Sequence, residues 1–151
     1  DHGGATRARN LANILDTSIA IVDKRRPRPN VCEAQSVIGD VDGKDCIVVD
    51  DICDTAGSLV AACDILKRFG AKDIYVCLAH GVFSGPAIER LENSCIKEVV
   101  CTNSIPLDEE KKAQTTKIKQ LSIGLMLSKL ILAISSHKPV SEIYRLFEDH
   151  E

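Results

Sequence analysis

Aromatic side chains are scarce in this sequence of 151 residues, which has no tryptophan, two tyrosines and three phenylalanines. Proteins that bind single-stranded nucleic acid usually stack the bases on aromatic rings, and their binding surfaces carry a strong positive charge. Here the formal net charge is −3 at pH 7, and residues 24–28 form the only dense basic run. The composition therefore argues against a nucleic-acid partner.

A long apolar run is also lacking. The longest apolar stretch, residues 121–134, contains Lys129 and is shorter than the roughly 20 residues that span a bilayer. The first residues do not have the pattern of a signal peptide. We therefore expect a cytoplasmic protein with no membrane partner.

Paired cysteine motifs are a third absence. The seven cysteines are odd in number, they include no C-x-x-C pair, and several of them lie in apolar segments. This pattern is typical of reduced, buried thiols in the cytosol, and it argues against a zinc site. With 44% hydrophobic and 27% charged residues, the chain can form one packed core, so we predict a single domain over residues 1–151.

The stretch of residues 46–58 organises the predicted fold. Residues 46–49 are apolar and mostly β-branched, which predicts a strand that is buried on both faces of a parallel sheet and ends at Asp50 and Asp51. A loop of small residues follows, and then a helix that ends at Gly70. The apolar stripe of this helix consists of Leu59, Ala62, Leu66 and Phe69.

The loop between this strand and helix, from Asp54 to Ser58, predicts a phosphate site. Backbone N–H groups at a helix N-terminus have no intrahelical partner, and the helix dipole adds positive charge there. The Thr55 and Ser58 hydroxyls could add donors. The carboxylates of Asp50 and Asp51 would repel phosphate, so we expect them to face sugar hydroxyls or a divalent cation. A phosphorylated sugar satisfies both requirements; the alternative is that Asp54 only caps the helix and the other two carboxylates form a solvated turn.

Two earlier segments also have the composition of anion sites. Residues 1–4 form a glycine turn before an amphipathic helix, and the alternative is a plain turn without a ligand. Residues 18–23 predict the next buried strand, a neighbour of residues 46–49 in the sheet. Residues 24–30 are basic and contain two prolines, which predicts a mobile loop. Cationic loops stabilise the charge that develops in phosphoryl transfer, although a solvated basic turn or a nucleic-acid contact is also open.

The rest of the chain completes an α/β pattern of alternating strands and helices, which predicts a parallel sheet flanked by helices. We expect a strand or hairpin arm over residues 31–41, a turn at 42–43, and strands over 73–79 and 98–101. Residues 84–86 should open a short helix whose Ile88 and Leu91 point inward. A charged connection over 111–119 should lead to a final helix from about Ser122. The apolar face of the final helix predicts a core or subunit contact. His80 is given no role.

The stretch from Val48 to Ser58 resembles the phosphoribosyl-diphosphate (PRPP) loop of type I phosphoribosyltransferase-fold proteins. Residues 1–9, 23–30, 80–87 and 100–106 narrow the resemblance to the ribose-phosphate diphosphokinase, or PRPP synthetase, family. The resemblance runs over nearly the whole chain but matches only the C-terminal half of that enzyme. We therefore expect this chain to be part of a longer protein.

The resemblance implies transfer of the terminal pyrophosphate of ATP to the C1 hydroxyl of ribose 5-phosphate, with Mg²⁺ as cofactor. It also implies a homo-oligomer, a hexamer in the family, and roles for individual residues. Lys24 and Arg26 would be catalytic, and Asp1 would bind the metal. The pyrophosphate loop would consist of Asp1, His2, Gly3 and Gly4, and the substrate site of Arg26, Asp50, Asp51, Asp54, Thr55, Ala56, Gly57 and Ser58.

Two other functions stay open. One is a non-catalytic regulatory homologue of PRPP synthetase. The presence of Asp50, Asp51 and an uninterrupted basic loop argues against it. The other is a nucleobase phosphoribosyltransferase, which uses PRPP and is expected to carry a base-recognition segment that this sequence does not show. The tail over residues 140–147 matches the family's regulatory ending only imperfectly.

Overall fold

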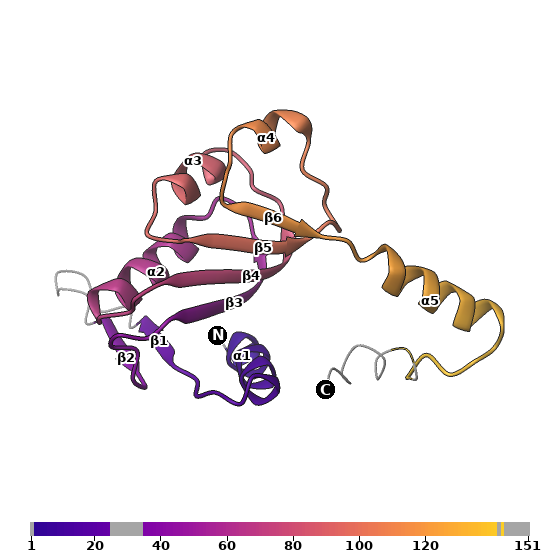
Figure 1. Ribbon diagram of the computed structural model, residues 1–151, viewed down its shortest axis with the longest axis horizontal. Coiled ribbons are helices and arrows are strands. Elements are labelled where there is room, and N and C mark those ends of the chain that lie inside the picture. Colours follow the sequence, from indigo (N-terminus) through magenta and orange to yellow (C-terminus); the bar gives the residue numbers. More distant parts are fainter. Residues whose placement is uncertain (1, 25–34, 142, 144–151) are drawn as a thin grey trace. The chain divides into compact units, whose positions relative to one another are not determined.

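The computed structural model describes residues 2–24, 35–141 and 143 of the chain (Figure 1). Its contacts form two compact units, residues 1–120 and residues 121–151. The helices and strands are α1 (His2–Ile14), β1 (Ile21–Lys24), β2 (Gln35–Ile38), β3 (Cys46–Cys53), α2 (Gly57–Arg68), β4 (Ile74–Gly81), α3 (Ala87–Glu92), β5 (Glu98–Thr102), α4 (Glu109–Ala113), β6 (Ile118–Leu121) and α5 (Gly124–Ser135). The single domain over residues 1–151 stays a prediction.

The predicted α/β fold with a parallel sheet is confirmed. Four strands lie in the order β3-β4-β5-β6, with β3 parallel to β4 and β4 parallel to β5, and the arrow of β6 points the same way as β5 (Figure 1). Cys46 pairs with Ile74 and Cys53 with Gly81. The carboxyl ends of these strands therefore meet at one edge of the sheet, where ligands of such folds bind.

The core lies between this sheet and the helices α2 and α3. The fully buried side chains include Cys63, Ile65, Ile74, Val76, Phe83, Leu91, Ile96, Val99 and Cys101. Ile88 and Leu91 point inward as predicted. Phe69 does not, because it lies beyond the last turn of α2 as the C-cap and is 45% exposed.

The predicted place of the first strand was wrong. β1 pairs antiparallel with β2 in a separate two-stranded sheet, and it is not a neighbour of β3. The pairing is local, because residues 35–38 return as the predicted hairpin arm, and short connections favour neighbours in the sequence. The predicted turn at 42–43 is present, with Gly43 at a φ of 67°.

The bounds of several elements also differ from the prediction. β3 continues through Asp50 and Asp51 to Cys53, and it is not buried on both faces, because it is an outer strand of the four-stranded sheet, where Ile47 is 46% exposed. The glycine turn predicted at residues 1–4 is the first turn of α1 from His2 onward. The charged connection contains α4, whose first turn is capped by the Asp108 carboxylate, and then β6.

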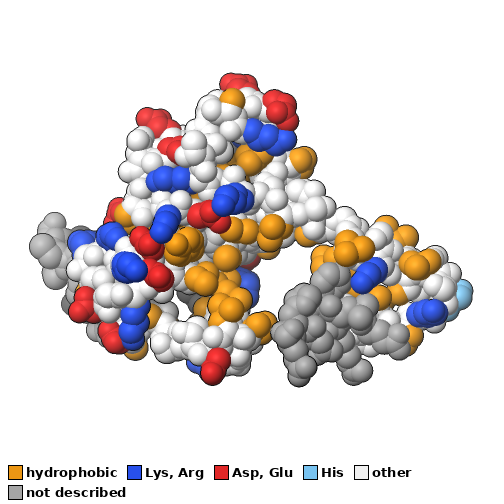
Figure 2. Space-filling view, in the orientation of Figure 1, with side chains coloured by type: hydrophobic (Ala, Val, Ile, Leu, Met, Phe, Trp, Pro, Cys, Tyr) orange, Lys and Arg blue, Asp and Glu red, His pale blue; other side chains and the backbone are white. Residues whose placement is uncertain are grey.

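The second unit contains the predicted final helix, α5, which begins at Gly124 and carries mostly apolar side chains, many of them visible on the face shown in Figure 2. Its most exposed large apolar side chains are Leu125, Ile131, Leu132 and Ile134, each more than 60% exposed. The core or subunit contact of this helix stays a prediction. None of the described helices combines the length and the apolar character that crossing a membrane requires.

Candidate functional site

The predicted substrate loop lines one cavity of about 230 Å³ at the carboxyl end of β3. The residues around it are Asp50, Ile52, Cys53, Asp54, Thr55, Ala56, Ser58 and Leu59. Most of the predicted substrate residues are therefore brought together, with Gly57 next to them as the first residue of α2. Asp51 is not among the lining residues, since its side chain pairs elsewhere.

The loop opens directly onto the N-terminus of α2, a helix of 12 residues. Ala56 occupies the N-cap position with φ 61° and ψ −2°, a left-handed conformation that is uncommon for a residue other than glycine. The methyl side chain of Ala56 cannot accept a hydrogen bond, so it does not satisfy the N–H groups of the first turn. The alternative that Asp54 caps this helix is therefore wrong.

Arg7 of α1 pairs with two carboxylates of β3, and the sequence did not predict this role. Its Nη2 lies 3.2 Å from Asp51 Oδ2 and 4.0 Å from Asp50 Oδ1. Desolvation would raise the pKa of Asp51, but the charge of Arg7 and backbone N–H groups hold the pKa below its ordinary value. Asp51 is thus a carboxylate at neutral pH, and a cation already stands beside it.

Cys53, the last residue of β3, carries a buried thiol. Burial raises its pKa to about 11, against a hydrogen bond from the Ala56 N–H that lowers it. The charges of Asp50 and Asp54 contribute to the same rise in pKa. The cysteines in the described part of the chain are all free thiols, as predicted.

Cys53 should react with iodoacetamide at pH 8 at least about tenfold more slowly than glutathione, because the thiolate is the nucleophile and little of it forms below the raised pKa. Site-resolved mass spectrometry of timed samples measures the rate. Unfolding in urea should bring the rate up to that of glutathione. Equal rates in the folded chain would contradict the buried, protonated thiol.

The remaining predicted site residues are not brought to this cavity by the described structure. Asp1 and Arg26 lie outside the described residues, as does most of the predicted loop over 24–30. Lys24 ends β1, and His2 to Gly4 form the first turn of α1. Within the described ranges, no group of three or more His, Cys, Asp or Glu side chains could hold a metal ion.

Ser84 and Arg90, which the sequence analysis missed, bind the loop from α3 and the segment before it. Ser84 Oγ donates a hydrogen bond to Asp54 Oδ1, and Arg90 Nη1 donates to the Thr55 carbonyl at 2.9 Å. His80 instead shares a hydrogen bond with Ser104 Oγ at 2.7 Å, which ties the ends of β4 and β5 together. No local sequence signal shows such pairings, since their partners lie far apart in the chain.

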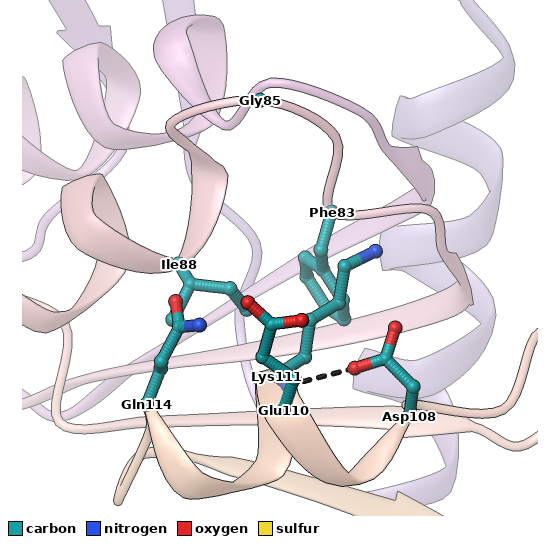
Figure 3. A pocket seen from close by; sticks show the side chains of 7 residues that line it. All are labelled: Phe83, Gly85, Ile88, Asp108, Glu110, Lys111 and Gln114. Carbon is teal, nitrogen blue, oxygen red and sulfur yellow. Dashed lines mark hydrogen bonds between the residues drawn. The ribbon is translucent and has the colours of Figure 1, made fainter.

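A second cavity of about 260 Å³ lies between the segment after β4 and α4. Figure 3 shows its lining residues, which are Phe83, Gly85, Ile88, Asp108, Glu110, Lys111 and Gln114. Its hydrogen-bonded pair is structural, because Asp108 accepts from the Lys111 backbone N–H as the cap of α4. This cavity contains none of the predicted site residues.

A parallel sheet with carboxylates at a strand end and an open helix N-terminus beside them is the arrangement of α/β domains that bind ligands at the carboxyl ends of their strands. Residues 17–145 match the family described as phosphoribosyl synthetase-associated domain, and the chain belongs to this family.

Two relatives and one solved structure illustrate the similarity. The chain is 52% identical over 144 residues to the ribose-phosphate pyrophosphokinase of Staphylococcus saprophyticus and 51% identical to that of Bacillus subtilis. These matches cover 95% of this chain but 44% and 45% of the relatives, so the chain spans less than half of their length. The crystal structure of phosphoribosylpyrophosphate synthetase from Mycobacterium smegmatis matches with a TM-score of 0.75 and 34% identity, over 87% of this chain and 42% of that chain.

Proposed function

We propose that this chain forms part of a ribose-phosphate pyrophosphokinase, which makes PRPP and AMP from ribose 5-phosphate and ATP. The observation that carries the proposal is the cavity at the end of β3, where a carboxylate and the N-terminus of α2 lie side by side. The two relatives are ribose-phosphate pyrophosphokinases, which supports the enzyme over a regulatory homologue and over a nucleobase phosphoribosyltransferase.

Ribose 5-phosphate fits this cavity in one orientation. Its phosphate belongs at the first turn of α2, where backbone N–H groups and the helix dipole favour negative charge. Its hydroxyls are donors that the Asp50 carboxylate can accept. The reverse orientation would place the phosphate against Asp50 and lose the helix N-terminus.

Mg²⁺ fits the donors present only in part. This ion prefers oxygen ligands and is usually held by one or two carboxylates together with phosphate oxygens of the substrate. Asp50 provides one such carboxylate at the cavity, and Asp1 is proposed as another. When bound, Mg²⁺ would neutralise charge on the phosphate oxygens of ATP.

The reaction forms a bond between the C1 oxygen of ribose 5-phosphate and the β-phosphorus of ATP. The bond from the β-phosphorus to the oxygen that bridges it to the α-phosphorus breaks, that oxygen leaves with AMP, and the C1 hydroxyl loses its proton. Negative charge spreads over the transferring oxygens, and we propose that Lys24 and Arg26 stabilise it. The protein residues around the cavity hold the acceptor sugar in place.

We also propose that the complete protein is a cytoplasmic homo-oligomer. The exposed apolar surface of α5 supports burial against another part of the assembly, since contiguous apolar patches of this kind mark interaction sites. Light scattering of the complete protein measures the number of copies. A monomer at micromolar concentration would contradict this part of the proposal.

The isolated chain should bind ribose 5-phosphate in the presence of Mg²⁺ but should turn over poorly, because it spans less than half of its relatives. Isothermal titration calorimetry measures binding, and AMP formation from ATP measures turnover. A chimaeric enzyme, in which this chain replaces the matching segment of the Bacillus subtilis relative, should regain turnover. Absence of binding would contradict the assignment of the substrate loop. Full turnover by the isolated chain would contradict the expectation that catalysis also needs the part of the relatives that this chain does not match.

A further inference from the structure

The segment that follows β4, residues 82–84, is hydrogen-bonded to the start of the substrate loop. The backbone N–H groups of Val82 and Phe83 both donate to the Cys53 carbonyl, at 3.0 and 3.2 Å, and the Ser84 N–H donates to the Asp54 carbonyl at 3.0 Å. Phe83 is fully buried and has a φ of 49°. Residues 82–84 are therefore anchored in the core through Phe83 and hydrogen-bonded to the last residue of β3 and the first residue of the loop.

Arg90 adds a hydrogen bond to the middle of the loop. It lies on α3, and its Nη1 donates to the Thr55 carbonyl at 2.9 Å. A Cβ atom added at Gly57 would lie 3.4 Å from the same nitrogen. The guanidinium group thus lies against the loop from Thr55 to Gly57, the three residues around the start of α2.

The hydrogen bond of Arg90 fixes the direction of one peptide group. In a trans peptide the C=O and N–H groups point in opposite directions, and no cis peptide is present among the described residues. Between Thr55 and Ala56, the C=O points to Arg90 while the N–H donates to the Cys53 thiol. Both ends of this peptide are held, and it is the peptide that precedes the left-handed residue Ala56.

We infer that Arg90 is a positioning residue for the substrate, whose guanidinium holds the Thr55–Ala56 peptide so that the first turn of α2 faces the phosphate of ribose 5-phosphate. This inference rests on the proposed function. Without the Arg90 bond, the peptide before Ala56 loses one of the two hydrogen bonds described above, and left-handed residues such as Ala56 persist only where their surroundings hold them. Arg90 does not itself need to touch the ligand.

The test compares Arg90→Met, which keeps the length of the side chain but removes its charge, with Arg90→Lys. Lys112→Met is the matched control, since it removes a charge from the exposed helix α4. Arg90→Met should raise the Kd for ribose 5-phosphate about tenfold, Arg90→Lys should recover part of the loss, and the control should change nothing. In the chimaeric enzyme the KM for ribose 5-phosphate should rise while the KM for ATP stays constant.

Amide hydrogen exchange of the ligand-free chain separates this inference from the proposed function. Arg90→Met should speed exchange in residues 55–58 and leave β4 unchanged. If the wild-type chain does not bind ribose 5-phosphate, the proposed function fails and the exchange rates alone decide the role of Arg90. Unchanged exchange in the loop would overturn the inference, and so would equal rises in both KM values together with a lower melting temperature.

Discussion

Replacing Lys24 or Arg26 by alanine in the chimaeric enzyme should lower kcat by about 10³ to 10⁵, the range of other cationic groups that act in phosphoryl transfer. These charges are proposed to act on the transferring pyrophosphoryl group, so they stabilise the transition state more than the bound substrates. Their removal should therefore lower kcat much more than it raises KM. Steady-state kinetics with both substrates varied measures the two effects.

The same basic run provides the controls. Arg25→Ala and Arg28→Ala remove equal charges from neighbouring positions, and the family resemblance gives neither residue a catalytic role. Both should cost far less than tenfold in kcat. Equal small losses at all four positions would mean that the run only supplies diffuse positive potential. A change in KM alone would make it a substrate-binding loop, and the catalytic roles would then be wrong.

Replacing Asp50 or Asp51 by alanine should weaken ribose 5-phosphate binding about ten- to a hundredfold, because a hydrogen bond to a charged group contributes about 1.5–3 kcal/mol. The two positions act differently in the structure. Asp50 lines the cavity, whereas Asp51 holds Arg7 at 3.2 Å. Asp51→Ala should act indirectly, because Arg7, once released from Asp51, can pair more closely with Asp50 and compete with the sugar hydroxyls for that carboxylate. Calorimetry on the isolated chain measures both affinities.

Asp40→Ala is the control for these variants, since it removes an exposed carboxylate that pairs with Lys44 outside the site. It should leave the affinity unchanged. The melting temperatures of all three variants should stay close to that of the wild type, because the carboxylates are exposed. Unchanged binding in Asp50→Ala and Asp51→Ala would mean that these two carboxylates belong to a solvated turn and do not bind the sugar.

The sequence predicted the part of the site that is continuous in the chain. Strand, loop and helix over residues 46–70 follow from the apolar run, the small residues and Gly70, and the structure contains all three. The order of the outer strands could not be predicted in this way. β1 pairs with β2, the next strand in the sequence, although Ile21 and Ile38 are 40% and 60% exposed there. Short connections favour such local pairing, and the apolar pattern of residues 18–23 does not indicate which strand is the neighbour.

The residues that hold the site together could not be predicted from local patterns. Arg7, Ser84 and Arg90 are polar residues on or before helices, where most such side chains are solvated. Only the fold places Arg7 beside the carboxylates and Arg90 within hydrogen-bonding distance of the Thr55 carbonyl. The prolines and charges of residues 24–30 predicted a basic loop, and that prediction lies outside the described residues apart from Lys24.

The bonds that hold the substrate loop also set an order of events as the protein folds. Ser84 and Arg90 lie 30 and 35 residues after their partners in the loop. Until β4 has paired with β3 and α3 has packed, residues 53–57 lack these donors, and joining segments so far apart has an entropic cost that only the completed core offsets. We therefore expect a nascent or partly refolded chain to carry the whole loop sequence without the proposed phosphate site. The proposed affinity for ribose 5-phosphate should therefore appear late in folding, once β4 has paired with β3 and α3 has packed.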